Sequence, residues 1–155
     1  MKGTDASTPH QELISVLNEA ISLEYAAVIH YNQHSMLLTG PDKLLYEDLF
    51  RHSAEDSLGH AKKWGDRIVY LGGVPTPEIR EKPQTLEVAE MLQLSLEIEQ
   101  KAVDVYSRAH KICKHEPTLY MLEHQIVDED SDVERIKKLL GRVEVMHART
   151  MKPAA

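Results

Sequence analysis

The sequence predicts an all-α protein: a bundle of four helices with one long crossover between the second and the third. Three observations support this prediction. Glycine and proline are few and fall in a handful of places, four long segments between them repeat apolar residues every three or four positions, and about a dozen residues join the two middle segments. With 155 residues, the whole chain, 1–155, is expected to form a single domain.

The first two helices are expected over residues 8–39 and 41–71, where Pro41 suits the first turn of a helix. The stripe predicted for the first helix is Ile14, Leu17, Ile21, Glu24, Val28, Tyr31, Ser35 and Leu38. The stripe predicted for the second is Leu45, Leu49, Ser53, Asp56, His60, Trp64, Ile68 and Leu71. Both stripes are apolar at their ends and contain charged or polar residues near the middle.

The other two helices are expected over residues 85–115 and 117–145. The predicted stripe of the third is Leu92, Leu96, Glu99, Val103, Tyr106, His110 and Cys113. The predicted stripe of the fourth is Leu122, Ile126, Glu129, Val133, Ile136, Leu140 and Val143. The connection over residues 72–83 is too long for a tight helical hairpin and long enough to run along a bundle, which indicates a crossover.

Composition limits the classes of partner. A formal charge of −7 disfavours a nucleic-acid-binding surface and suits cations. A single cysteine, Cys113, excludes an internal disulfide and a cysteine-based metal cluster. The polar beginning of the chain does not resemble a secretory signal, and no run approaches the roughly 18 consecutive apolar residues of a membrane span. We therefore expect a cytoplasmic protein with no nucleic-acid or membrane partner.

Three of the predicted helices carry one glutamate near the middle of the stripe, Glu24, Glu99 and Glu129, and the fourth carries His60 at that level. Burying an unpaired carboxylate costs several kcal/mol, so each acid needs a partner. These acids can pair with lysine, arginine or histidine from neighbouring helices, or the stripes can be rotated so that the acids face water. Because the stripes contain almost no lysine or arginine, a bound cation is the favoured interpretation.

Helical spacing predicts which neighbours reach the same cation. Asp132 lies three residues after Glu129, and Asp56 lies four residues before His60, so each falls on the same side of its helix as that residue. Glu55, five residues before His60, points elsewhere. Mixed carboxylate and imidazole ligands suit iron, manganese or zinc.

Four segments carry a family resemblance: NEAISLEYAAVIHYNQHSMLL, HAKKWGDRIVYLGGVP, VAEMLQLSLEIE and VDEDSDVERIKKLL. With them the chain resembles bacterioferritin, within the ferritin-like di-iron carboxylate proteins, up to about residue 140. The resemblance implies a ferritin-like four-helix bundle that binds iron. It places Glu24, Glu99 and Glu129 at carboxylate ligand positions, His60 at the imidazole ligand position, and Tyr31 at a tyrosine close enough to donate an electron.

Three positions depart from the family pattern. Ser57 stands where the family has a carboxylate that bridges the two irons, and Asp132 stands where it has a histidine. Leu58 replaces the methionine that binds haem, so haem is not expected. Asp56 is a candidate substitute for the missing bridge. The resemblance therefore implies one or two iron ions per chain, in an asymmetric site.

In that asymmetric site, one ion is expected to bind tightly to Glu99, Glu129 and Asp132, with Glu24 as a further candidate ligand. A weaker second position is expected near His60. The asymmetry follows because a neutral serine hydroxyl is a poor replacement for a shared carboxylate.

The function implied by the resemblance is that of a ferroxidase, which oxidises Fe²⁺ with dioxygen or peroxide and stores the ferric product in a homo-oligomeric shell. The alternative is a non-catalytic metal-binding or structural shell subunit with a degenerate di-iron centre. A DNA-protecting miniferritin is disfavoured, because in that family the ligands come from two subunits and this sequence has no basic arm.

Overall fold

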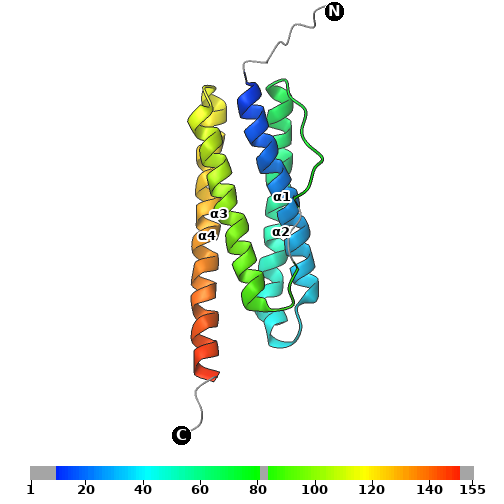
Figure 1. Cartoon of the computed structure of the whole chain (residues 1–155), viewed down its shortest axis with the longest axis vertical. Coiled ribbons are helices and arrows are strands. Elements are labelled where there is room, and N and C mark those ends of the chain that lie inside the picture. The colour runs from blue at the N-terminus through cyan, green and yellow to red at the C-terminus, as the bar shows by residue number, and fades with distance from the viewer. Residues whose placement is uncertain (1–9, 81–83, 151–155) are drawn as a thin grey trace, which may run out of the picture.

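The computed structural model describes residues 10–80 and 84–150, with side chains up to residue 141. Within these residues it contains helices and loops and no strands (Figure 1). The helices are α1 Gln11–Leu37, α2 Gly40–Tyr70, α3 Val88–Ile112 and α4 Glu116–Thr150. The predicted all-α bundle of four helices with a long crossover is therefore confirmed.

The helices pack as two antiparallel pairs, α1 with α2 and α3 with α4, and α1 also packs against α3 (Figure 1). The turn between α1 and α2 is short because Gly40, with a φ of 58°, adopts the left-handed region that favours glycine. Pro41 then occupies the first turn of α2, where its missing N–H costs little.

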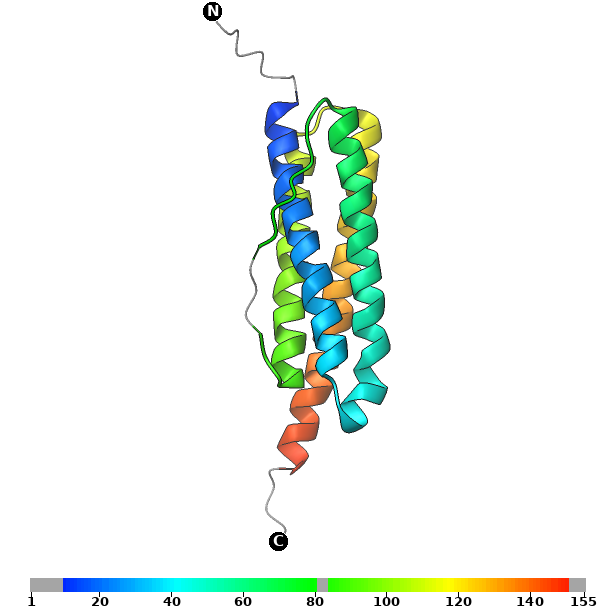
Figure 2. The same cartoon turned by 90° about the vertical axis from the view of Figure 1, so that its right-hand side faces the viewer.

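As far as residue 80, the connection after α2 runs along the outside of α1 toward the opposite end of the bundle, where α3 begins (Figure 2). Asn18 of α1 attaches this segment through both ends of its amide. Its Nδ2 donates to the carbonyl of Val74 over 3.0 Å, and its Oδ1 accepts from the backbone N–H of Thr76 over 2.7 Å. The crossover predicted over residues 72–83 agrees with the described residues 72–80, and residues 81–83 lie outside the described part of the chain.

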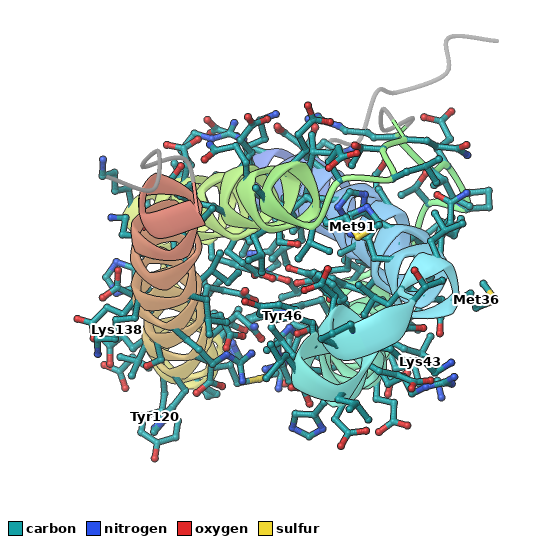
Figure 3. The ribbon with its side chains drawn as sticks, turned by 90° about the horizontal axis from the view of Figure 1, so that it is seen from below. Met36, Lys43, Tyr46, Met91, Tyr120 and Lys138 are labelled. Carbon is teal, nitrogen blue, oxygen red and sulfur yellow. The ribbon has the colours of Figure 1, made fainter. Side chains whose placement is uncertain are left out.

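The core runs the length of the bundle between the four helices. Its largest fully buried side chains include Trp64, Ile68, Leu17, Leu92 and Leu122, which together come from every helix. Figure 3 looks along the bundle and shows side chains from all four helices filling the space between them. In this view Tyr46 points into that space, while Lys138 points away from it.

The predicted stripe of the second helix is wrong at its beginning. Leu45 is 62% exposed, whereas its neighbour Tyr46 and, one turn later, Phe50 are buried. A change of one residue turns a helix face by about 100°. The aromatic rings decide the orientation here, because Phe50 stacks on Tyr31 of α1 with the ring centroids 6.1 Å apart.

The helix ends differ slightly from the prediction. The third helix begins at Val88 and not near residue 85, because the Thr85 hydroxyl accepts the backbone N–H of Glu87 in a local turn. The fourth helix continues to Thr150, beyond the predicted end near residue 145. The side chain of Val143, predicted in the fourth stripe, lies outside the described side chains.

Helix α1 is long and apolar enough, by length and composition alone, to cross a membrane. However, 61% of its most apolar 18-residue window is buried inside the bundle, where it packs against α2 and α3. Its apolar character is therefore explained by its place in the core.

Candidate metal centre

The middle of the bundle holds a buried polar cluster to which each helix contributes one side chain. Glu24 comes from α1, His60 from α2, Glu99 from α3 and Glu129 from α4. The three glutamates are at most 5% exposed, and the His60 side chain is 17% exposed. Each of these residues lies in the apolar stripe of its helix. Because the apolar residues one turn before and after it pack into the core, the polar side chain is buried with them.

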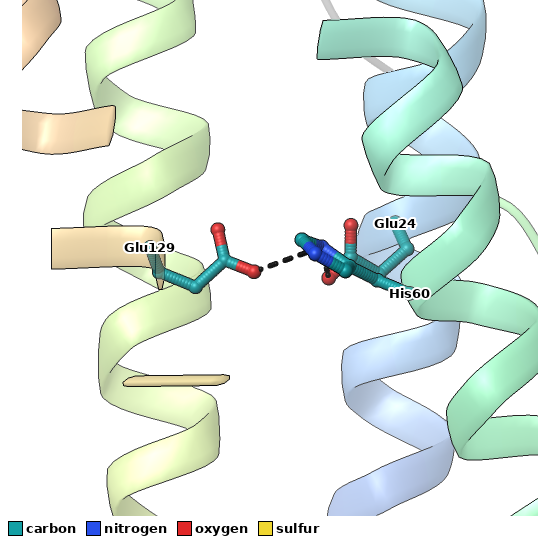
Figure 4. A group of neighbouring side chains, drawn as sticks. All are labelled: Glu24, His60 and Glu129. Atoms are coloured by element: carbon teal, nitrogen blue, oxygen red, sulfur yellow. Dashed lines mark ion pairs between the residues drawn. The ribbon is translucent and has the colours of Figure 1, made fainter. Parts of the chain in front are cut away.

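The first ligand group consists of Glu24, His60 and Glu129, whose ligand atoms all lie within 4.8 Å of one another. His60 Nδ1 lies 3.1 Å from Glu129 Oε1 and 3.4 Å from Glu24 Oε1 (Figure 4). Neither contact has the geometry of a hydrogen bond, so this buried nitrogen lacks a directed partner. Two carboxylates and an imidazole that converge in this way suit a divalent transition metal.

The second group consists of Glu99, Glu129 and Asp132, whose ligand atoms also lie within 4.8 Å of one another. Asp132 is three residues after Glu129 on α4, its side chain is 24% exposed, and its carboxylate is paired with Arg135 at 2.8 Å. Glu129 belongs to both groups. It is therefore the carboxylate best placed to contact two neighbouring ions.

Two buried tyrosines form hydrogen bonds between α1 and α3. The hydroxyl of Tyr31 on α1 donates to Glu99 Oε1 on α3, and the hydroxyl of Tyr106 on α3 donates to Glu24 Oε1 on α1 over 2.6 Å. Each tyrosine thus holds the glutamate of the opposite helix. Tyr31 therefore lies at the cluster, and its role as an electron donor stays a prediction. Tyr106, which was predicted only in the stripe of the third helix, lies there as well.

The cluster distributes protons unequally among its acids. Burial, reinforced by the charge of Glu129, raises the pKa of Glu99 well above its ordinary value, and burial also raises the pKa of Glu24. Burial acts to raise the pKa of Glu129 too, but contacts with His60, Glu99 and Gln125 outweigh it and lower that pKa. Of these three acids, Glu129 is therefore the one whose surroundings favour the ionised form before any cation binds.

His60 is the cationic partner of these acids. Burial alone would lower the pKa of His60, but the two neighbouring carboxylates, Glu129 and Glu24, raise it to about 10. The imidazole is thus protonated at neutral pH and balances part of the negative charge. A metal ion that replaced this proton would meet the same carboxylates.

Asp56, a predicted ligand, belongs to neither group. Its side chain is 44% exposed, and its carboxylate lies 3.4 Å from Nε2 of His52, one turn earlier on α2. Its charge still contributes to raising the pKa of Asp132, after the larger effect of burial. Ser57 is buried but supplies no ligand atom to either group. Among the described histidine, cysteine and acidic side chains, His60 is therefore the one member of these two groups that comes from α2.

Two buried residues near the cluster were not among the predicted site residues, although Trp64 was predicted in the stripe of the second helix. Gln125 lies one turn before Glu129 on α4 and donates to it, and the indole of Trp64 on α2 donates to Gln125. The spacing of four residues between Gln125 and Glu129 was the available signal, because it places both side chains on one helix face.

Comparison with known proteins agrees with this architecture. The Ferritin-like domain family model matches residues 14–146. A bacterioferritin from Desulfovibrio desulfuricans is 30% identical over 126 residues, which are 77% of this chain and 68% of that protein. A bacterioferritin from Streptomyces coelicolor is 27% identical over 137 residues, which are 86% of this chain and 82% of that protein.

Solved structures give the same result. A ferritin-like, diiron-carboxylate protein from Bacillus anthracis superposes with a TM-score of 0.81 at 29% identity, over 84% of this chain and 96% of that one. A dodecameric thioferritin from Bacteroides fragilis, a bacterioferritin-related protein, superposes with a TM-score of 0.82 at 22% identity over 92% of each chain, which shows the fold alone. Because the family model covers most of the sequence, this chain is a bacterioferritin-like member of the ferritin-like domain family.

Proposed function

We propose that the protein binds Fe²⁺ in the middle of its bundle and oxidises it, as a ferroxidase that stores or detoxifies iron. The observation that carries this proposal is the convergence of Glu24, His60, Glu99 and Glu129, one from each helix, on one buried point. Such a cluster is costly to bury without a cation, and its ligand types suit iron.

Charge supports oxidation as well as binding. Fe²⁺, the substrate, would lose one electron to dioxygen or peroxide and gain a positive charge. Carboxylates stabilise the ferric product more than the ferrous ion, because the attraction grows with the charge of the ion. Asp132 adds a partly exposed carboxylate beside Glu129. Tyr31, hydrogen-bonded to Glu99, is the candidate donor of a further electron.

The relatives support the same assignment by their names, which describe bacterioferritins and a diiron-carboxylate protein. We accordingly propose one or two iron ions per chain, a homo-oligomer and a cytoplasmic location. Haem is not part of the proposal, because Leu58 has no ligand atom to offer.

A second function has a specific observation in its favour. The bridging carboxylate of α2 is replaced by Ser57, and the nearby Asp56 is directed to His52. A subunit with such a site can bind metal without oxidising it and serve as a structural or metal-binding part of a shell.

The test is the rate of ferric absorbance after anaerobic Fe²⁺-loaded protein meets oxygenated buffer in a stopped-flow instrument. We expect the protein to oxidise Fe²⁺ faster than buffer alone, and Glu99→Ala to lose the acceleration because it removes a ligand of the second group. Equal rates with and without protein would reject the ferroxidase. Tight Fe²⁺ binding without acceleration would establish the second function instead.

Replacing Ser57 by glutamate tests the asymmetric site. The new carboxylate would enter the bundle from α2, one turn before His60, and is expected to strengthen the weaker ion position about tenfold because a charged ligand replaces a neutral one. Fe²⁺ oxidation should also become faster. Calorimetric titration with Co²⁺ would measure the affinities, and Ser53→Glu, equally buried but two turns from His60, is the matched control. Two ions of equal affinity in the wild type, unchanged by Ser57→Glu, would show that the asymmetric site is wrong.

A further inference from the structure

A buried chain of hydrogen bonds joins α2 to the shared carboxylate on α4. The indole N–H of Trp64 donates to Oε1 of Gln125 over 3.0 Å, and Nε2 of Gln125 donates to Oε1 of Glu129 over 2.5 Å. Trp64 and Gln125 are completely buried, and Glu129 is 2% exposed. Water therefore does not compete with this chain.

The direction of this chain is determined by chemistry. An indole has only a donor, so the carbonyl oxygen of Gln125 must face Trp64. The amide NH₂ of Gln125 must then face Glu129, and Glu129 must accept. A flipped amide would place two donors against each other at one end and two acceptors at the other. Trp64 thus fixes which group of Gln125 meets the carboxylate.

Trp64 is itself held against the other side of the cluster. Its ring packs on Tyr106 with the centroids 5.5 Å apart, and the Tyr106 hydroxyl donates to Glu24. The two carboxylates of the first ligand group, Glu24 and Glu129, are therefore tied to one aromatic pair. Their relative position depends on contacts that lie outside the ligand groups.

We propose that Gln125, oriented by Trp64, is a positioning residue for Glu129. By holding Oε1, it limits rotation of the one carboxylate that belongs to both ligand groups, so that this carboxylate can serve two ion positions. The inference rests on the proposed metal site, and it deepens that proposal by naming the residues that preorganise its shared ligand.

The first test uses Co²⁺ under anaerobic conditions, because its visible absorption spectrum reports ligand geometry without any oxidation. We expect Gln125→Leu, which keeps the side-chain bulk but removes the amide, to weaken Co²⁺ binding about tenfold, the size expected for losing a hydrogen bond to a charged group. The Co²⁺ spectrum should change at saturation. Ser35→Ala, which removes an equally buried hydroxyl that bonds only within α1, is the control and should alter neither.

A double variant guards against misfolding. Gln125→Leu alone leaves the indole N–H of Trp64 without its acceptor, whereas Trp64→Phe with Gln125→Leu removes both partners and keeps an aromatic ring. Circular dichroism identifies the folded variants. Wild-type Co²⁺ affinity and spectrum in a folded variant would overturn the positioning role and leave the proposed function standing. No Co²⁺ binding by the wild type would overturn the proposed function and the positioning role together.

A measurement on the wild-type protein tests the positioning role independently of any substitution. Trp64 is the only tryptophan of the chain, so its ultraviolet resonance Raman spectrum reports one indole N–H. We expect the hydrogen-bond marker band of this indole to shift when Zn²⁺ binds to Glu129. Coordination withdraws electron density from the carboxylate, which changes its hydrogen bond with Gln125 and, through the amide, the hydrogen bond of Gln125 with Trp64. A marker band that is typical of an unbonded indole, or that Zn²⁺ at saturation leaves unmoved, would overturn the proposal.

Discussion

Replacing Glu129 by glutamine is expected to weaken cation binding at both ion positions, whereas Glu24→Gln should weaken it at one. Glu129 belongs to both ligand groups, and Glu24 belongs only to the group of His60. Leaving a buried cation short of its charged partner costs about 3–5 kcal/mol, which corresponds to a loss of affinity of roughly a hundredfold or more. Glutamine keeps the size of the side chain, so the effect isolates its charge.

Calorimetric titration with Zn²⁺ measures the number of ions and their affinities together. Glu134→Gln is the matched control, because Glu134 lies on the same helix, is 66% exposed and pairs only with Lys138 one turn later. The control should bind as the wild type does. Should Glu129→Gln lose one ion and keep the other at full affinity, the shared carboxylate would be wrong and each position would have its own ligands.

The fold could be predicted from the sequence because its signals are local. Glycine and proline mark the turns, and the spacing of apolar residues orients α1, α3 and α4 correctly about their axes. The beginning of α2 was misjudged, since Leu45 and Tyr46 are both apolar enough for the core. Only packing against a neighbour separates them, and here the ring of Tyr31 selects the face that carries Phe50.

The residue types of the candidate site could also be predicted from local signals in the sequence. A lone acid in the middle of an apolar stripe is a local signal, and the structure brings Glu24, Glu99 and Glu129 together with His60 and Asp132. Metal binding by these residues stays a prediction. Helical spacing predicted both Asp132 and Asp56 as metal ligands, but only Asp132 belongs to a ligand group, because Asp56 pairs with His52. Spacing along one helix cannot tell which of two nearby acids pairs with another residue.

The spacing of residues within a helix does not predict which side chains meet between helices. Tyr106 meets Glu24 across 82 positions of the chain, and Trp64 meets Gln125 across 61. Such pairs depend on how α1 and α2 are placed beside α3 and α4, which no spacing within one helix encodes. These contacts hold the ligands in place, so the ligand types are visible in the sequence while their preorganisation is visible only in the structure.

Binding of a divalent cation is expected to release protons, so affinity should rise steeply with pH. Burial raises the pKa of Glu99 well above its ordinary value and so favours its protonated form in the metal-free protein. The pKa of His60, about 10, keeps the imidazole protonated as well. His60 must lose its proton to act as a ligand, and so must Glu99 wherever it is protonated, whereas the lowered pKa of Glu129 favours its ionised form.

The sign and size follow from linkage. Each proton released on binding raises the affinity about tenfold per pH unit while that group is protonated, so the proton of His60 alone gives roughly tenfold between about pH 6 and 7, and the raised pKa of Glu99 acts in the same direction. Titration with Zn²⁺ in two buffers of different ionisation enthalpy counts the protons directly. His60→Gln removes one titrating group and should reduce the count by one. A proton count of zero, with an affinity that does not change with pH, would mean that the acids and His60 are already free of protons, or that the ion binds elsewhere in the molecule.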